Sequence, residues 1–188
     1  KGRRLSAACS WRRGMDLSKL ASIFANTLAD EDAPRKVAEK QLKAFEGVQG
    51  YTPALLRMMT IAEIPVQVKQ AAAVKLKNLV DEYWTIEEGQ YHKILEADRK
   101  LIRDNLVESY IFQPAQPLRV QMIQCLFLII RHDFPTKWDL MPIVMKNYHS
   151  KDSKRIFGAL QCTRLIFKKY QFRTAKRREK VFEIINIT

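Results

Sequence analysis

The sequence predicts an all-α fold, a solenoid of antiparallel helix pairs that stack into a superhelix. Three observations predict it. Apolar residues recur at three- and four-residue steps along most of the chain, which is the period of an amphipathic helix. Proline and glycine stand singly between these periodic segments, where they end one helix and begin the next. The helix pairs themselves recur at a regular spacing, which is typical of a repeat architecture.

The patterns predict the helices in chain order. We expect them over residues 17–28, 34–45, 53–62, 66–84, 96–112, 118–134, 138–149 and 153–170, with another from about residue 175. Pro34 marks the start of the second, and Thr52 is expected to cap the third. The first helices of successive pairs are separated by steps of 36, 43, 42 and 37 residues. HEAT and armadillo repeats recur at roughly 40 residues, so the chain holds about four and a half HEAT-type pairs.

The stretch 117–138 is the most informative single element. Two apolar rows run along it, with Val120, Ile123, Phe127 and Ile130 in one and Met122, Leu126 and Ile129 in the other. Gln121, Gln124 and Arg131 mark the remaining polar side. A helix that is apolar on more than half of its circumference has to lie between other helices. Pro135 ends it, because a proline pushes the residue before it out of the α region, and Trp138 is expected to open the next helix.

The first 14 residues differ from the rest of the chain. They carry five positive charges and no acid, show no helical period, and precede Met15, which resembles a natural start. We interpret residues 1–14 as an unstructured basic leader outside the natural fold, with a mitochondrial transit peptide as the alternative. Residues 15–188 then form one HEAT-repeat domain, cut off inside its fifth pair.

The charge balance is positive. The chain carries a formal charge of +13, from 33 lysines and arginines against 20 acids. Such a surplus can attract nucleic acid, anionic lipid or an acidic protein surface. The run 168–180, basic with interleaved aromatics, is the candidate nucleic-acid patch. Because acids and bases alternate over most of the chain, which is typical of a solvated surface, we expect no nucleic-acid partner. The apolar runs are also shorter than the roughly 20 residues that cross a membrane.

The residue types that catalysis or metal binding needs do not come together. His132 and Asp133 are adjacent, but adjacent residues on a helix do not face each other. The six glycines never adopt the spacing of a phosphate loop. Cys125 and Cys162 fall inside apolar helical patterns, where a free cysteine acts as a small hydrophobe. The unpaired spacing of the three cysteines indicates a reducing compartment. We expect no enzymatic activity, no cofactor and no metal.

The helix expected over residues 66–84 is the second informative element. Its predicted buried row is Val68, Ala72, Leu76, Leu79 and Tyr83. Gln70, Lys77 and Asp81 lie on another face, at steps of seven and four residues. The residues alone leave open whether Lys77 and Asn78 have a partner or are ordinary surface residues near a helix end.

Two long stretches resemble the amino-terminal region of the importin-β (karyopherin-β) family. Ile64-Pro-Val-Gln-Val-Lys-Gln-Ala-Ala-Ala-Val-Lys-Leu-Lys-Asn78, followed by Tyr83-Trp84, is similar to the second helix of that family's second repeat. The stretch from Arg119 through Ile129-Ile-Arg-His-Asp-Phe-Pro-Thr-Lys-Trp138 is similar to the second helix of its third repeat and the exit from it. The resemblance covers essentially all of residues 15–188 and is strongest to the importin-seven/importin-eight subgroup, with lysine at position 69 where we expect arginine.

The resemblance implies a nuclear transport receptor that binds the small GTPase Ran in its GTP form. Such a receptor carries protein cargo through nuclear pores and moves between cytoplasm and nucleus. The second helices of the first three pairs would line one concave surface, and the implied Ran contacts are Gln70, Lys77, Asn78, Gln121, Gln124 and Arg131. Cargo and nucleoporins would bind further along the solenoid, and we expect a monomer. The alternatives are a generic HEAT-repeat scaffold and a basic helical nucleic-acid binder.

Overall fold

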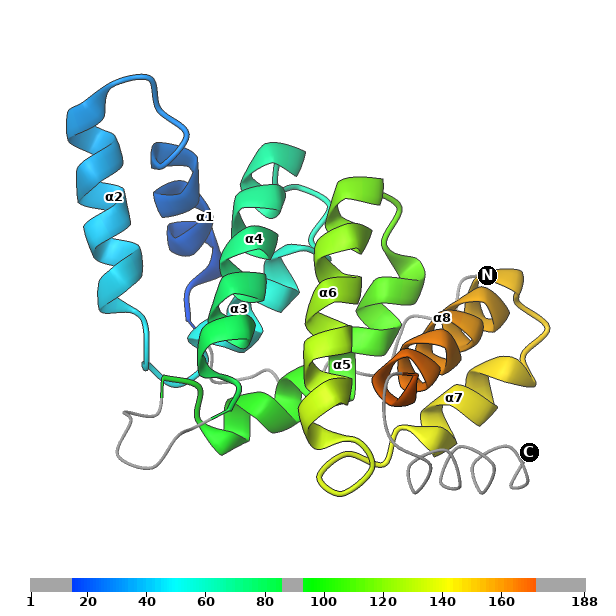
Figure 1. Ribbon diagram of the computed structural model, residues 1–188. Coiled ribbons are helices and arrows are strands. Elements are labelled where there is room, and N and C mark those ends of the chain that lie inside the picture. The colour runs from blue at the N-terminus through cyan, green and yellow to red at the C-terminus, as the bar shows by residue number, and fades with distance from the viewer. Residues whose placement is uncertain (1–14, 86–92, 172–188) are drawn as a thin grey trace.

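A computed structural model describes residues 15–85 and 93–171, and within these ranges the chain is helical and contains no strand (Figure 1). The helices are α1 (Leu17–Asn26), α2 (Asp32–Ala44), α3 (Tyr51–Met58), α4 (Val66–Tyr83), α5 (Glu96–Phe112), α6 (Gln116–Asp133), α7 (Met141–Tyr148) and α8 (Ser153–Tyr170). Each helix expected in these ranges is present, so the all-α prediction is confirmed. The leader, the helix expected from residue 175 and most of the basic run 168–180 lie outside the described residues.

Local sequence signals set the ends of several helices. The Asp16 carboxylate accepts hydrogen bonds from the backbone N–H groups of Ser18 and Lys19, at 3.0 and 3.2 Å, and so caps α1. Asp152 caps α8 by accepting from Lys154 N–H at 2.9 Å. The helix α6 ends at Asp133, and Phe134 before the proline is extended, as the sequence predicted.

Two expected helix starts are wrong. Thr52 does not cap α3 but lies buried inside it, and the capping position is taken by Gly50. Gly50 has a φ of 86°, a left-handed conformation that favours glycine, and both carboxylate oxygens of Asp98 accept its N–H, at 2.9 and 3.1 Å. Trp138 does not open α7. Its N–H donates to the carbonyl of Asp133 at 3.1 Å, so it belongs to the turn after α6, and α7 begins at Met141.

The second helices of pairs two to four form a row. In Figure 1 the helix α4 lies beside α6, and α6 in turn packs on α8. Behind this row α3 packs on α4 and α5, while α5 packs on α6 and α8, and α7 packs on α8. The helix α6 therefore lies between neighbours on several sides, which confirms the expectation from its two apolar rows. Stacking of this kind gives each pair the apolar surface that it lacks alone.

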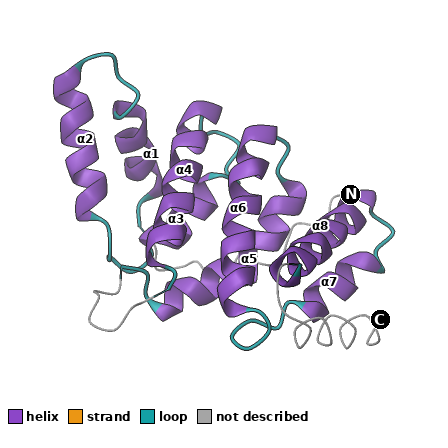
Figure 2. Ribbon diagram, viewed as in Figure 1, coloured by secondary structure: helices purple, strands orange, loops and turns teal. Residues whose placement is uncertain are grey.

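The first pair joins the row differently. Among the described helices α2 contacts α1 only, and α1 packs on α3 and α4 (Figure 2). The expectation that the second helices of the first three pairs line one surface is therefore wrong for α2. The continuous surface starts at α4, and α1 takes the place beside it.

Only one of the two apolar rows on α6 is fully buried. Met122, Leu126 and Ile129 are buried, together with Ile130 from the other row. Ile123 and Phe127 are half-buried, and Val120 is exposed. Both rows were predicted to be buried, but the side of α6 that carries Val120, Gln124 and Arg131 is open to solvent.

A glycine allows α8 to approach α5 closely. A Cβ atom added to Gly158 would lie 2.4 Å from Cγ1 and 2.9 Å from Cδ1 of Ile111 on α5. Real Cβ atoms do not come so close to another carbon. Gly158 therefore fixes the distance at which the third and fourth pairs stack.

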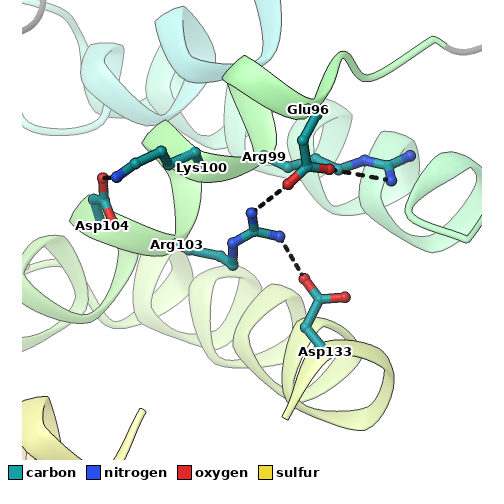
Figure 3. A network of polar contacts seen from close by, with 6 residues as sticks. All are labelled: Glu96, Arg99, Lys100, Arg103, Asp104 and Asp133. Carbon is teal, nitrogen blue, oxygen red and sulfur yellow. Dashed lines mark hydrogen bonds and ion pairs between the residues drawn. The ribbon is translucent and has the colours of Figure 1, made fainter. Parts of the chain in front are cut away.

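A buried ion network joins the start of α5 to the end of α6 (Figure 3). The Arg103 guanidinium donates to the Asp133 carboxylate at 2.8 Å on one side and to Glu96 on the other. Burial lowers the pKa of Arg103, but its hydrogen bonds to Glu96 and Asp133 outweigh burial and hold that pKa above its ordinary value. Asp133 is the last residue of α6, so the network fixes the exit that the sequence marks with Phe134 and Pro135.

Candidate protein-binding surface

The helix α4 buries one side and leaves the other open. Val68, Ala72, Leu76 and Leu79 are buried, as predicted, whereas Tyr83 of the same expected row is half-buried. The opposite side carries polar residues at helical spacing. Of the predicted contact residues on α4, Gln70 and Asn78 are exposed and Lys77 is half-buried.

Gln70 and Asn78 border a groove between α4 and the end of α1. The cavity has a volume of about 500 Å³ and is lined by Phe24, Thr27, Leu28, Gln67, Gln70, Ala71, Val74, Lys75 and Asn78. Two of its apolar side chains are exposed, since Leu28 has 51% and Val74 has 38% of its surface accessible. Large apolar residues that gather in a groove with a polar edge are typical of a protein-interaction site.

Lys77 lies on the other side of α4, at the seam with α6. Its positive charge acts on the Cys125 thiol of α6, although burial dominates and raises the pKa of that thiol to about 12. Asp81 acts on the same thiol with the opposite sign. The predicted residues of α4 therefore divide between two seams, with Gln70 and Asn78 toward α1 and Lys77 toward α6.

The helix α6 continues the surface beside α4. Gln124 and Arg131 are exposed on the side that also carries Val120. Gln121 is half-buried and stands one turn before Cys125, so it shares the side of α6 that faces Lys77. Figure 1 shows α4 and α6 running in the same direction, so Gln70 and Gln121 lie toward one end of the surface and Arg131 toward the other. The structure thus brings the six predicted residues onto two adjacent helices.

The edge of the groove is held by an ion cluster that sequence reasoning missed. The Glu46 carboxylate, in the loop after α2, accepts hydrogen bonds from Lys75 at 2.5 Å and from Lys93 at 2.9 Å. Lys93 also donates to the Tyr83 hydroxyl at 2.7 Å. That bond and the bond to Glu46 raise the pKa of Lys93. The cluster ties Lys75 of the groove to the loop between α2 and α3, through Glu46, and to the loop between α4 and α5, through Lys93.

We expect Glu46→Gln to lower stability at neutral pH by about 1 kcal/mol. Burial raises the pKa of Glu46, but hydrogen bonds from Lys75 and Lys93 outweigh it, so the net pKa lies below its usual value of 4.5. A carboxylate with a lowered pKa stabilises the fold above its unfolded pKa and loses that contribution as the pH falls through the folded pKa. The difference between variant and wild type in urea unfolding should therefore be present at pH 7 and shrink below about pH 4.5.

Glu39→Gln is the matched control, because Glu39 is an exposed residue of α2 with the same charge. It should change stability by less than about 0.5 kcal/mol at either pH. A pH-independent loss in Glu46→Gln would show that the side chain acts by packing and not through its charge.

The described residues hold no constellation for metal binding. No group of three or more histidines, cysteines or acids lies close enough to hold an ion within residues 15–85 and 93–171. Cys125 and Cys162 are free and buried, and burial raises the pKa of each thiol to about 12. No helix in this part of the chain combines the length and the apolar character that a membrane crossing requires.

Comparison with known proteins places these features in a family. Residues 38–111 match the family model described as the Importin-beta N-terminal domain. Importin-8 from Mus musculus is 33% identical over 180 residues, which is 92% of this chain and 18% of the relative. Exportin-2 from Homo sapiens is 34% identical over 157 residues, which is 83% of this chain and 16% of the relative. This chain therefore spans less than a fifth of these curated relatives.

A solved structure supports the same fold. The structure titled "The exportin Cse1 in its cargo-free, cytoplasmic state" matches with a TM-score of 0.79 at 23% identity, over 92% of this chain and 18% of that one. The helix pairs and their stacking define a HEAT-type α-solenoid protein. The matched domain and the two groups of relatives identify it further: the chain belongs to the importin-β family.

Proposed function

We propose that this chain is the amino-terminal, Ran-GTP-binding part of a nuclear transport receptor that imports protein cargo. The observation that carries the proposal is the surface of α4 and α6, of which α4 lies inside the match to the importin-beta N-terminal domain. It combines a polar strip, from Gln70 to Asn78, with the apolar groove at Leu28 and Val74. Proteins recognise one another through such a combination of apolar contacts and a polar rim.

Selectivity for the GTP form does not need a contact with the nucleotide. The γ-phosphate orders the switch loops of a small GTPase, and they are released after hydrolysis. A rigid surface that fits the ordered loops binds only that state. We take the row α4–α6–α8 as such a surface, because its neighbouring helices pack on one another and are backed by α3 and α5. Lys77, Gln121 and Arg131 supply hydrogen-bond donors on it.

Cargo release follows from linkage. If Ran-GTP weakens the binding of import cargo, cargo weakens the binding of Ran-GTP by the same factor. Cargo and nucleoporins would bind to parts of the longer protein beyond these residues. The longer protein would act as a transport receptor and not as an enzyme, and it would move between the cytoplasm and the nucleus through the nuclear pore. The similar identity of Exportin-2 makes an export receptor the second candidate. In that case cargo and Ran-GTP would strengthen each other's binding.

We expect Lys77→Ala to weaken binding of Ran-GTP by about 2 kcal/mol, which is a factor of about 30 in Kd. Lys77 is half-buried at the seam of α4 and α6, so a partner covering that seam removes its ammonium group from water and has to supply a hydrogen-bond acceptor. The measurement is biolayer interferometry of the chain against Ran loaded with a non-hydrolysable GTP analogue or with GDP.

Lys100→Ala is the matched control. Lys100 is an exposed lysine on α5, which lies behind the α4–α6 row, and its partner is Asp104 at 2.6 Å. This variant should bind as wild type does. Equal affinity for the two nucleotide states, or an unchanged Lys77→Ala variant, would rule the proposal out in favour of a HEAT-repeat scaffold with another partner.

A further inference from the structure

A second cavity lies at the seam between the third and fourth helix pairs, away from the surface of α4. It has a volume of about 620 Å³ and is lined by Tyr110, Ile111, Phe112, Gln113, Pro114, Arg119, Ser153, Lys154 and Phe157. These residues come from the end of α5, the loop after it, and the first turns of α6 and α8. A cavity of roughly 300 to 1,000 Å³ is large enough for a small ligand or a few side chains of a peptide.

The charge at this cavity is positive and not neutralised. Arg119 on α6 donates to the Gln116 side-chain oxygen, which is neutral, and Lys154 on α8 is exposed. None of the described residues that line the cavity is an acid. The first turns of α6 and α8 add the positive ends of two helix dipoles.

Two carboxylates close in the sequence to lining residues already have partners. Glu108 on α5 accepts two hydrogen bonds from Arg155, at 3.0 and 2.6 Å. Asp152 accepts from the backbone of Lys154 at 2.9 Å as the cap of α8. Because these acids are engaged by other donors, the charges of Arg119 and Lys154 remain available to a ligand.

The apolar part of the cavity is aromatic and exposed. Phe112 has 41% and Phe157 has 50% of its surface accessible. The Arg155 guanidinium lies over the Phe112 ring, 4.8 Å from its centroid, and the two bonds to Glu108 hold it there. The ring of Phe112 is thereby covered on one face by Arg155, while part of its surface stays accessible. Phe112 and Phe157 line the same cavity, and exposed apolar side chains that gather at one site are typical of an interaction surface.

We propose that this cavity binds a short acidic peptide segment that carries one aromatic or large aliphatic side chain. The apolar side chain packs between Phe112 and Phe157, and flanking carboxylates pair with Arg119 and Lys154. Charge complementarity favours an acidic ligand, and the apolar lining favours a peptide. Nucleic acid draws its affinity from many phosphate contacts, and two cations beside an apolar wall do not provide them. The site does not depend on the proposed Ran surface.

The test uses the whole 188-residue chain and fluorescence anisotropy of a fluorescein-labelled peptide, Glu-Asp-Asp-Phe-Asp-Glu. Wild type should bind this peptide and should bind two variants of it at least about tenfold more weakly. One variant is the neutral sequence Gln-Asn-Asn-Phe-Asn-Gln and the other replaces the phenylalanine with alanine. The double variant Arg119→Glu with Lys154→Glu should bind the acidic peptide with an affinity lower by about tenfold or more. Phe157→Ala should also lose binding of the peptide, although this substitution leaves the charge of the protein unchanged.

Arg164→Glu with Lys168→Glu is the matched control, because it makes the same change in charge at exposed positions further along α8. It should bind the acidic peptide as wild type does, and so should Lys77→Ala. Absence of binding by wild type, equal binding of the neutral peptide, or an unaffected Arg119→Glu, Lys154→Glu variant would overturn the proposal. It would equally be overturned if a 20-nucleotide single-stranded DNA bound more tightly than the peptide and only through Arg119 and Lys154.

Discussion

Gly158→Val is expected to destabilise the protein by about 3 kcal/mol. The new Cβ would lie 2.4 Å from Cγ1 of Ile111, and turning Cγ1 away is costly because a β-branched residue in a helix has one strongly preferred χ1 rotamer. The helix α8 would have to move away from α5 and open the seam between the third and fourth pairs. Urea unfolding followed by circular dichroism measures the loss.

A double-mutant cycle with Ile111→Ala separates this cause from helix propensity. Removing Cγ1 and Cδ1 of Ile111 makes room for the new side chain, so the two substitutions together should cost less than the sum of their separate effects by about 1 kcal/mol or more. Additive effects would mean that Gly158 matters for a reason other than its contact with Ile111.

Asp133→Ala is expected to cost about 3 kcal/mol, because it leaves Arg103 buried without its buried partner. The Asp133 and Arg103 side chains have only 5% and 10% of their surface accessible. Glu96, the other partner of Arg103, has 70% of its surface accessible, so it compensates only weakly. The free energy of unfolding from urea titration checks this value.

Asp104→Ala provides the comparison, since Asp104 forms an exposed ion pair with Lys100 on the outer side of the same helix (Figure 3). We expect it to cost less than about 0.5 kcal/mol. A similar loss of stability in Asp133→Ala and Asp104→Ala would show that burial does not decide how strongly these ion pairs stabilise the fold.

The positions of the helices could be predicted closely because the signals for them are local. The apolar period of residues 66–84 and 96–112 gave helices that match α4 and α5 to within one residue. Prediction was wrong where a particular hydrogen bond, which the apolar period does not reveal, decides the start. Gly50 begins α3 because Asp98, 48 residues away, accepts its N–H, and Trp138 is held in a turn by the carbonyl of Asp133.

The binding surface could be predicted only in part for the same reason. Periodicity shows which side of a helix is apolar but not which neighbour covers it. Gln70 and Asn78 were placed correctly on the exposed side of α4. The groove that they border is shared with the end of α1. Nothing in the sequence of α4 indicates that its neighbour on this side is α1 and not α2. The exposed Val74 between these two polar residues was the one available signal for the groove.

The attachment of α2 has a mechanical consequence for the amino-terminal end of the solenoid. Because α2 contacts only α1 among the described helices, its position follows that of α1. One further tie holds the end of α2, since Glu46 in the loop after it accepts hydrogen bonds from Lys75 and Lys93. A ligand in the groove between α1 and α4 would contact the helix that carries α2, so we expect binding there to affect the position of α2 as well.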